Sequence, residues 1–416
     1  MTRTGNRLIR LETATRLLLA IVLTTLLLAC SPSSDDNTTD PRSLSWPEIE
    51  QAARGQTVYF VMWTGDPAIN RYMNEFVVPR LRERHGINLE IVPGQADIPS
   101  MLMTEMEAGQ SVSSMDMVWI NGQVFYQLRQ IDALYGPFTG RLPNDRYVDW
   151  DNPMIATDFQ QKVNGYESPW GNVQLLLIID RARVPNPPRT PHALAEWIRG
   201  HPGRFTFDNE FTGLSFLKSL MYTFAESPRE LQGPFDPEVY EQLKNRVFDW
   251  VRGVRADLWR GGRTFPKDVA QLHQLFANGE VDFTMSFNDG EVDNKVAIGL
   301  FPKTATAYAL KTGTLQNTHY LGIVARSAHK AAAMVVANFL ISPAAQLEKL
   351  KPAVWGDGTV LAVERLPEPW RSRFKNVPGR SRAPAREDLQ PYARPEPAPQ
   401  YMIRLDEDFR NEILRQ

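Results

Sequence analysis

Two continuous apolar runs limit the fold of this chain more than any other feature of its sequence. The first is Val58–Met62 and the second is Val173–Ile179, and neither shows the regular polar alternation of a half-exposed strand. Such runs are typical of strands covered on both faces, as in a mostly parallel sheet with helices on each side. We therefore expect an α/β architecture. Because the two runs lie more than a hundred residues apart, we expect two lobes, each built around one of them.

Helix signals follow the first run at once. Asp66 and Pro67 form an N-cap and a first-turn proline, apolar residues then recur at helical spacing up to Leu81, and Gly86 ends the pattern. Further along we expect, in order, a strand at Asn88–Val92, a helix at about Asp97–Gly109 and a strand at Asp116–Ile120. This β-α-β-α-β order predicts a doubly wound lobe.

The second run begins a similar succession, which predicts a second lobe. One expected helix begins at Thr190-Pro191, and the others cover Thr212–Phe224, Phe235–Trp259 (as a helical hairpin), Pro266–Asn278 and Ala328–Leu340. The expected strands are Arg204–Phe207, Val281–Phe287 and Asn317–Ala325. The segment Leu366–Gln400 is rich in proline and arginine. We expect it to cross the surface in extended form before a last short helix.

The first thirty residues have the pattern of an export signal. Four arginines precede an apolar run from Leu17 to Leu28, which is followed by Ala29 and Cys30, the only cysteine in the 416 residues. This arrangement resembles the bacterial lipobox, in which a lipid joins the cysteine and the chain is cut before it. We expect residues 1–29 to be a lipoprotein signal peptide, Cys30 to be lipidated (palmitate included), and residues 30–50 to be a flexible tether. The alternative is an ordinary cleaved signal, or an uncleaved anchor with an incidental cysteine.

Several segments, in chain order, resemble the solute-binding proteins of bacterial ABC importers. They are VYFVMWTGDP at 58–67, MDMVWING at 115–122, SPWGNVQLLLIID at 168–180, RTPHALAEWIRGHPGRFTF at 189–207, LFANGEVDFTMSFNDGEV at 275–292 and SAHKAAAMVVANFLISPAAQLEK at 327–349. The last is the most specific, because a helix followed by a leucine, small residue, Pro, x, x, Gln step is the family's return to its first lobe. The likeness is nearest to the YnjB-type lipoprotein subfamily.

The resemblance implies a type II periplasmic-binding-protein fold, with two doubly wound α/β lobes joined by a hinge and a ligand cleft between them. The first lobe would comprise residues 51–172 and 315–416, and the second lobe residues 173–314. The implied role is that of an extracytoplasmic, membrane-anchored component of an ABC import system. It would capture a small molecule in the cleft and deliver it to the permease and ATPase subunits, without catalysis, cofactor or metal.

The candidate binding residues follow from where ligands bind in open α/β sheets. The carboxyl ends of the strands and the N-termini of the following helices direct free N–H groups outward, so solutes bind beyond them. We therefore expect ligand contacts in the loops after the predicted strands, at the first crossing between lobes and at the start of the helix at 212. The candidates are Trp63, Gly65, Asp66, Trp119, Asn121, Gln123, Trp170, Thr212, Gly213, Ser215, Ser286, Phe287, Asn288, Asp289 and Tyr320.

These residues also have structural interpretations, since Asp66 is a helix cap, Asn121-Gly122 is a common turn pair and Trp170 suits a core. If the aromatic candidates converge, they suit a flat ring, a sugar face or a cation, and an acidic Asp66 or Asp289 favours a cation. The helix expected to begin at Thr212 could hold a carboxylate or phosphate on its free N–H groups.

Other classes of protein fit the sequence less well. The formal net charge is −2, and removal of the leader takes away four arginines and one glutamate, so the chain has no broad attraction for nucleic acid. Neither a G-x-S-x-G elbow nor an H-E-x-x-H helix is present, and no two histidines stand four residues apart. An exported hydrolase or lyase remains the alternative, because paired carboxylates converge only in the fold, and a protein-binding lipoprotein is a further one.

Overall fold

The computed structural model describes residues 39–94, 98–288 and 290–415. The predicted signal peptide, Cys30 and the candidate Asp289 lie outside the described residues. The chain divides into two compact units, one up to Leu44 and one from Ser45 to the end. In the first unit, η1 (Pro41–Ser43) is a single 3-10 turn capped by Asp40, whose side chain accepts the Arg42 N–H. All other elements belong to the second unit.

The second unit opens with α2 (Trp46–Ala53), which corrects part of the predicted tether. Ser45 and Glu48 form a reciprocal capping box, and Ile49 and Ala53, one turn apart, are fully buried. A helix with a capped start and a buried apolar face is a folded element. The tether predicted over residues 30–50 is therefore wrong from Trp46 onward.

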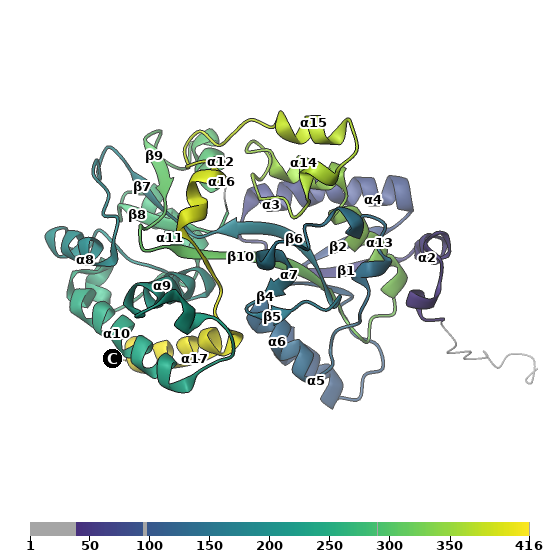
Figure 1. The fold of residues 1–416 in the computed structure, drawn as a ribbon, viewed down its shortest axis with the longest axis horizontal. Helices are drawn as coiled ribbons and strands as arrows, with labels where there is room; N and C mark the ends of the chain where they lie inside the picture. Colours follow the sequence, from purple (N-terminus) through teal and green to yellow (C-terminus); the bar gives the residue numbers. More distant parts are fainter. Residues whose placement is uncertain (1–38, 95–97, 289, 416) are drawn as a thin grey trace, which may run out of the picture. The chain divides into compact units, whose positions relative to one another are not determined.

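The first lobe is built on a sheet in the order β11-β10-β3-β1-β2, with β6 also paired to β10 (Figure 1). Its strands are β1 (Thr57–Met62), β2 (Asn88–Pro93), β3 (Met117–Ile120), β6 (Glu167–Gln174), β10 (Thr314–Ile323) and β11 (Ala393–Pro395). β1 lies parallel to β2 and β3, whereas β10 is antiparallel to β3 and β6. Apart from half-exposed Thr57 and exposed Tyr59, the residues of β1 are buried, as its continuous apolar run predicts.

Helices join and cover these strands. They are α3 (Pro67–Arg71), η2 (a π-helix, Tyr72–Val77), α4 (Val78–His85), α5 (Ile98–Glu107), α6 (Gly122–Gln130), α7 (Pro153–Ala156), α13 (Lys330–Leu340) and α14 (Pro343–Leu350). Asp66 caps α3 by accepting the N–H groups of Ala68 and Ile69, and Gly86, in the left-handed conformation, ends α4. The predicted start and end of this helical segment are confirmed.

The second lobe has a sheet in the order β8-β7-β9, with both outer strands antiparallel to β7. Its strands are β7 (Leu176–Asp180), β8 (Phe283–Ser286) and β9 (Ala305–Tyr308). Its helices are α8 (Pro191–Gly200), α9 (Phe211–Phe224), α10 (Pro237–Val254), α11 (Val269–Ala277) and α12 (Glu291–Ala297). A continuous core of buried side chains includes residues from all five helices and all three strands.

Two predicted elements of this lobe differ from those observed. Residues 204–207 form no strand, although Phe205 and Phe207 are fully buried, because the neighbouring segments bind them singly through Asp282 N–H and Trp259 N–H. The predicted hairpin at 235–259 is one helix, α10, followed by the short 3-10 turns η6 (Arg255–Asp257) and η7 (Trp259–Gly262). Buried aromatic residues therefore do not by themselves specify strand pairing.

The C-terminal part of the chain divides between the lobes. Short elements replace the predicted extended stretch: α15 (Trp370–Lys375), α16 (Arg386–Leu389), η9 (Gln390–Tyr392) and β11. The last helical segment, α17 (Pro399–Phe409) and the π-helix η10 (Arg410–Leu414), lies beside α9 and α10 (Figure 1). Tyr401, Leu405 and Phe409 belong to the second core, so the packing assigns α17 to the second lobe, although we expected all of 315–416 in the first.

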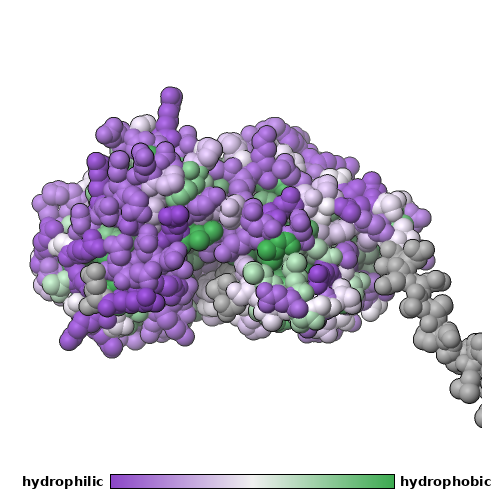
Figure 2. All heavy atoms as spheres, turned by 90° about the horizontal axis from the view of Figure 1, so that it is seen from below, coloured by the Kyte–Doolittle hydropathy of each residue, from purple (hydrophilic) through white to green (hydrophobic). Residues whose placement is uncertain are grey.

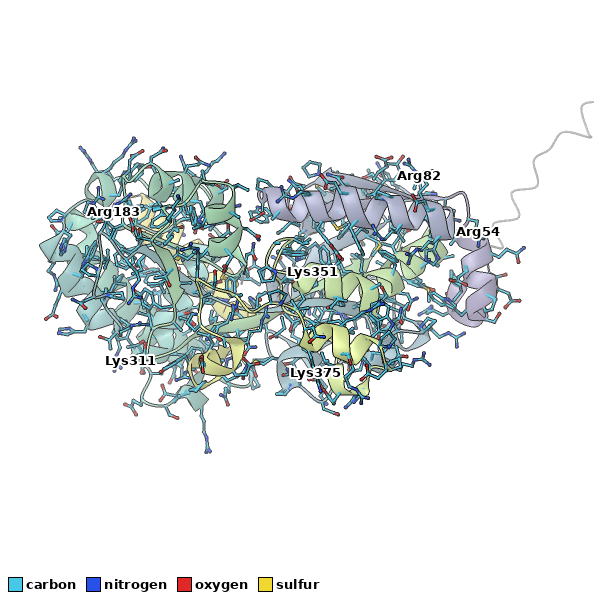
Figure 3. The ribbon with its side chains drawn as sticks, turned by 90° about the horizontal axis from the view of Figure 1, so that it is seen from above. Arg54, Arg82, Arg183, Lys311, Lys351 and Lys375 are labelled. Atoms are coloured by element: carbon cyan, nitrogen blue, oxygen red, sulfur yellow. The ribbon has the colours of Figure 1, made fainter. Side chains whose placement is uncertain are left out.

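The surface is mostly polar. The face in Figure 2 is largely hydrophilic with small, separate hydrophobic patches, and the six basic residues labelled in Figure 3 are spread over both lobes. Within the described residues, no single helix is long and apolar enough to cross a membrane. Among the described helices, only α13 and α14 taken together, with a bend of 54° between them, reach the length and apolar composition of a membrane-spanning segment. Nine residues of α13 are buried in the fold.

Candidate functional site

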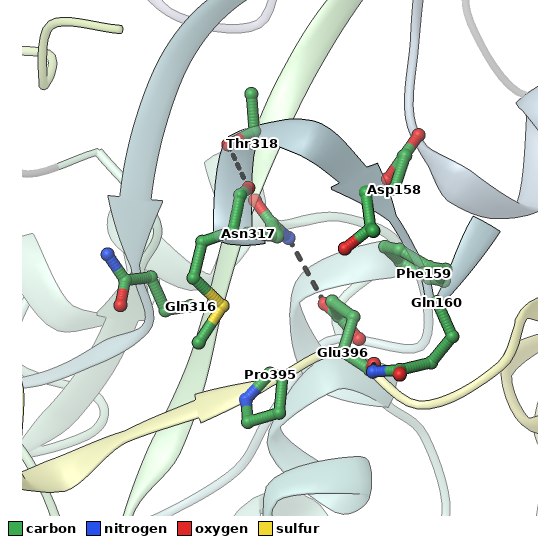
Figure 4. Close-up of a pocket in the computed structure, with 10 residues that line it drawn as sticks. Asp158, Phe159, Gln160, Gln316, Asn317, Thr318, Pro395 and Glu396 are labelled. Atoms are coloured by element: carbon green, nitrogen blue, oxygen red, sulfur yellow. Dashed lines mark hydrogen bonds between the residues drawn. The ribbon is translucent and has the colours of Figure 1, made fainter. Parts of the chain in front are cut away.

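A pocket lies where the chain passes between the two lobes (Figure 4). Its volume is about 240 Å³, its mouth included. Three segments line it: Met154 and Thr157–Gln160 around β4 (Thr157–Asp158), Gln316–Thr318 in β10, and Pro395–Glu396 between β11 and α17. The second and third segments connect one lobe to the other, so a molecule in this pocket would contact the chain at its crossings.

Buried charged groups surround the pocket. Lys218 of α9 is fully buried and its Nζ lies 2.5 Å from Glu396 Oε2, while Asn317 Nδ2 donates to Glu396 Oε1 at 3.1 Å. Asp158 is 1% exposed, and its Oδ2 has no hydrogen-bond partner among the described residues. Burial, followed by the nearby Glu396, raises the pKa of Asp158 well above its usual range, although Lys218 opposes this. Glu396 is therefore paired, whereas Asp158 is not.

A strained turn holds Asp158 at the pocket. Phe159 and Gln160, which follow it, have φ values of 44° and 64° in the left-handed region that most side chains avoid. Gln160 Nε2 donates to the Glu396 carbonyl at 2.6 Å, and the Phe159 ring lies against Gly122, where a Cβ would be 2.2 Å from it. Contacts from other parts of the chain thus fix the turn.

A second set of buried charges also joins the lobes. Asp66, at the start of α3, and Glu291 of α12 each lie 3.1 Å from the Nζ of Lys295, also on α12. His273 of α11 lies 3.5 Å from Glu291, and its Nδ1 is 2.8 Å from Thr284 Oγ1. Burial favours the neutral form of Glu291, but His273 and Lys295 outweigh burial and lower its pKa. Burial and Glu291 raise the pKa of Asp66 despite Lys295.

The aromatic candidates pack against one another. The rings of Trp119 and Trp170 lie 5.0 Å apart at 75°, and both contact His319 and Trp355. Trp170 is fully buried and Trp119 is 7% exposed. These edge-to-face and tilted contacts are those of a core. Trp63 is half-buried and its ring lies over Gly65.

The start of α9 already holds a carboxylate from the protein itself. Asp208 is 1% exposed and accepts the N–H groups of Gly213 and Glu210, and burial raises its pKa to about 6. Gly213 permits this, because a Cβ there would lie 1.7 Å from the Asp208 carbonyl oxygen. The predicted anion-binding N–H groups at Thr212–Gly213 are therefore at least partly used by Asp208.

The remaining candidates divide into two groups. Tyr320 is fully buried, and its hydroxyl donates to the Ile155 carbonyl at 2.9 Å, which is a structural role. Ser286 Oγ donates to Glu291 and accepts the Asn288 N–H, and the Phe287 ring lies 5.6 Å from Phe211. By contrast, five candidates have a buried polar atom without a partner among the described residues: Asn121 Oδ1, Gln123 Oε1, Trp170 Nε1, Ser215 Oγ and Asn288 Nδ2.

None of the predicted residues that the structure describes lines the pocket at the crossings. The sequence analysis missed Asp158, Gln160, Asn317 and Glu396. One signal was present: Asn317 and Thr318 are polar residues at the start of a segment expected to be a strand. The other lining residues carry no such signal, because Asp158 and Glu396 meet only in the fold. Within residues 39–94, 98–288 and 290–415, no three His, Cys, Asp or Glu side chains are arranged to hold a metal ion.

Comparison with known proteins identifies the family. Residues 77–375 match the family described as bacterial extracellular solute-binding protein. Protein YnjB of Escherichia coli (strain K12) is 37% identical over 336 residues, which are 80% of this chain and 86% of YnjB. The chain belongs to the bacterial extracellular solute-binding protein family. This solute-binding protein is accordingly extracytoplasmic, and it binds a small molecule for an ABC importer.

Solved structures support the fold of this solute-binding protein. An ABC transporter substrate-binding protein from Bradyrhizobium japonicum USDA 110 superposes with a TM-score of 0.62 at 14% identity, covering 86% of this chain and 99% of the other. The periplasmic binding protein AfuA from Actinobacillus pleuropneumoniae gives 0.60 at 12% identity, with 86% and 98% covered. Iron-bound HitA from Pseudomonas aeruginosa gives 0.57 at 16% identity, with 85% and 98% covered. The predicted type II periplasmic-binding-protein fold is confirmed.

Proposed function

We propose that this solute-binding protein holds a small polar solute in the pocket at the interlobe crossings and delivers it to an ABC permease. The observation that carries the proposal is the origin of the pocket lining. Asp158 and Gln160 come from the first lobe, Asn317 from a crossing strand, and Glu396 from the segment that leads into α17. A solute bound by all three segments would interact differently with each relative position of the lobes.

That dependence is the physical requirement for signalling occupancy. A ligand shifts a conformational equilibrium only by as much as its affinity for the two states differs. Contacts that exist only when the crossings are correctly placed supply such a difference, and a permease can then distinguish loaded from empty protein.

We further propose that candidates with an unpaired buried polar atom contribute to solute binding. Buried polar atoms are almost always paired, so an unpaired one suggests a partner that binds from outside. Asn121, Gln123, Trp170, Ser215 and Asn288 are the predicted residues that meet this criterion. The solute itself is not indicated by the fold, because similar structures hold solutes as different as agropinic acid, fructose-6-phosphate and iron.

The division of the lobes and the lipid anchor are also proposals. We place the boundaries near residues 173 and 315, with α17 in the second lobe. We propose that Cys30 is lipidated, because it is the only cysteine and it directly follows an apolar leader. When cells are grown with radiolabelled palmitate, we expect the wild-type protein to carry the label. The Cys30→Ala variant should carry none. Equal labelling would contradict the anchor.

Ligand-dependent melting tests the proposed function. The protein is heated with each member of a library of amines, amino acids, sugars, phosphates and vitamins. A solute at a hundredfold excess over its Kd adds about 2.7 kcal/mol of stability, which raises the melting temperature by a few degrees. At least one solute class is expected to do so. A library without any stabilising solute would contradict the proposal and favour a protein-binding lipoprotein.

A further inference from the structure

We infer that the pocket at the interlobe crossings binds a primary ammonium group, with Asp158 as its counter-ion. The inference rests on the proposed function and deepens it by naming the chemical class of the solute. Figure 4 shows the Asp158 carboxylate directed into the same space as the Asn317 amide and the Glu396 carboxylate. A buried carboxylate that faces a pocket with one unpaired oxygen is the central observation.

The buried carboxyl groups around the pocket outnumber the lysine that is paired with them. Lys218 pairs with Glu396, which also accepts the Asn317 amide. Asp158 receives one backbone N–H, from Gly122, at one of its oxygens. Glu167 of β6, also fully buried, has no hydrogen-bond partner for either oxygen among the described residues. Two carboxyl groups are thus left beside one internal ion pair.

A carboxyl group in such a place is either protonated or neutralised by a bound cation. Burial and Asp158 raise the pKa of Glu167, and Arg129 only partly offsets them. The Arg129 guanidinium lies 3.4 Å from the centre of the Tyr166 ring. Asp158 lines the pocket and Glu167 does not, so of the two carboxyl groups only Asp158 is placed to meet a ligand there.

The pocket suits an ammonium group better than a metal ion or an anion. An ammonium group donates three hydrogen bonds and accepts none. Asp158 Oδ2 is a free acceptor, and Thr318 Oγ1, which donates to the Met154 carbonyl and accepts the Asn172 amide, keeps one lone pair. Among the described residues no cluster suits a metal, and an anion would meet Asp158 and Glu396. The Phe159 ring already faces one ammonium group, that of Lys218, at 4.3 Å.

The size of the pocket limits how much of the solute it encloses. The enclosed part of the pocket is about 20 Å³, which is room for about one water-sized group, whereas the figure of about 240 Å³ includes open solvent. The pocket therefore suits the ammonium head of an amine, and the rest of the solute must lie outside the enclosed part. The sequence had suggested Asp66 as the acidic contact for a cation, but Asp66 is already paired with Lys295 and caps α3. Asp158 takes that place.

Amine binding should be coupled to proton release. Burial raises the pKa of Asp158 and so favours its protonated form in the empty pocket, whereas an ammonium group requires the carboxylate. The affinity for amines is therefore expected to rise with pH. The charged and titratable groups that face Asp158 or its coupled neighbour Glu167 are Glu396, Lys218, Arg129 and Tyr320. Tyr320, with a raised pKa, stays neutral in this range.

Calorimetric titration with n-butylamine tests the inference, with 1-butanol and butyrate as neutral and anionic controls of the same length. The wild-type protein is expected to bind the amine and neither control. Asp158→Asn, which keeps the shape and removes the charge, should weaken amine binding about 30-fold, or ~2 kcal/mol at 1.4 kcal/mol per tenfold. The matched control is Asp132→Asn, which removes an exposed carboxylate and should leave the affinity unchanged. Equal amine affinity in wild type and Asp158→Asn would overturn the inference.

A measurement on the wild type guards against a variant that fails to fold. Titrations at pH 6 and 8, each in two buffers of different ionisation enthalpy, report proton release directly. Tighter binding at pH 8 with protons released supports the inference, and pH-independent binding without proton exchange overturns it. If no amine binds but another solute class stabilises the protein, only the ammonium site fails. If no class of solute binds, the proposed function fails as well.

Discussion

Lys295 Nζ lies 3.1 Å from Asp66 Oδ2 and 3.1 Å from Glu291 Oε1, so one buried ammonium group joins the first lobe to the second. Lys295 and Glu291 share α12, whereas Asp66 caps α3 of the other lobe. The pair is buried on both sides, with 5% and 3% of the side chains exposed. Removing one partner of such a pair leaves an uncompensated charge, which costs more than the pair itself contributes.

Asp66→Asn should therefore destabilise the protein by about 2 kcal/mol. Asparagine still caps α3, so the loss of stability measures the effect of removing the charge. The loss stays moderate because Lys295 keeps its ion pair with Glu291. Urea unfolding measures it. The control is Asp236→Asn at the start of α10, an exposed cap with no ion pair to any described residue, which should change stability by less than about 0.5 kcal/mol. A cycle with Lys295→Met should show strong coupling, and simple additivity would contradict the account.

Acid should weaken the same cluster. The folded-state pKa of Glu291 is lowered, so its contribution to the free energy of unfolding is complete above its ordinary pKa of about 4.5 and is lost as pH falls below it. Glu291→Gln should be less stable than wild type by about 2 kcal/mol at pH 7, and the gap should narrow below pH 4.5. Urea unfolding at several pH values tests this. A gap that stays constant down to pH 3 would disagree.

The close approach of Asp208 to α9 depends on a missing side chain. Gly213→Ala places a Cβ 1.7 Å from the Asp208 carbonyl oxygen, so we expect a loss of about 2–3 kcal/mol. Gly200→Ala, at the end of α8, meets no atom within 4 Å and should be neutral or slightly stabilising. Thermal unfolding of both variants decides the matter. Equal melting temperatures would show that the backbone gives way at Gly213.

The turn beside the pocket should affect binding as well as stability. Gly122→Ala brings a Cβ to 2.2 Å from the Phe159 ring, so the turn that carries Asp158 and Gln160 must move. We expect solute affinity to fall at least tenfold, about 1.4 kcal/mol. Gly140→Ala, which meets nothing within 4 Å, should bind as wild type. Unchanged affinity in a folded Gly122→Ala protein would argue against this pocket as the site.

Local sequence signals predicted most of the first lobe. The apolar run of β1, the Asp66 cap and the Gly86 stop each depend on residues close in the chain, and each is confirmed. The signals failed where contacts with residues distant in the chain determine the local structure. Phe205 and Phe207 have strand-like composition but are held singly by other segments, and the direction taken by α17 depends on the core it meets.

The site was harder to predict for the same reason. The candidates follow strand ends, which is a local rule, and several of them prove to be packed or paired within the protein, as Trp170 and Asp66 are. Asp158 and Glu396 are 238 residues apart and neither has a local motif. Their meeting depends on the return of the chain through β10 and β11, which no short pattern encodes.

Fluorescence energy transfer between the lobes tests the central claim most directly, namely that solute binding and lobe movement are one event. Dyes are placed at Arg82→Cys on α4 and Lys311→Cys, both exposed, in a Cys30→Ala background that has no other cysteine. The account predicts that the stabilising solute changes the transfer efficiency saturably, with the midpoint found by calorimetry, and that Gly122→Ala shifts both midpoints together. Saturating solute that leaves the transfer efficiency unchanged would contradict it.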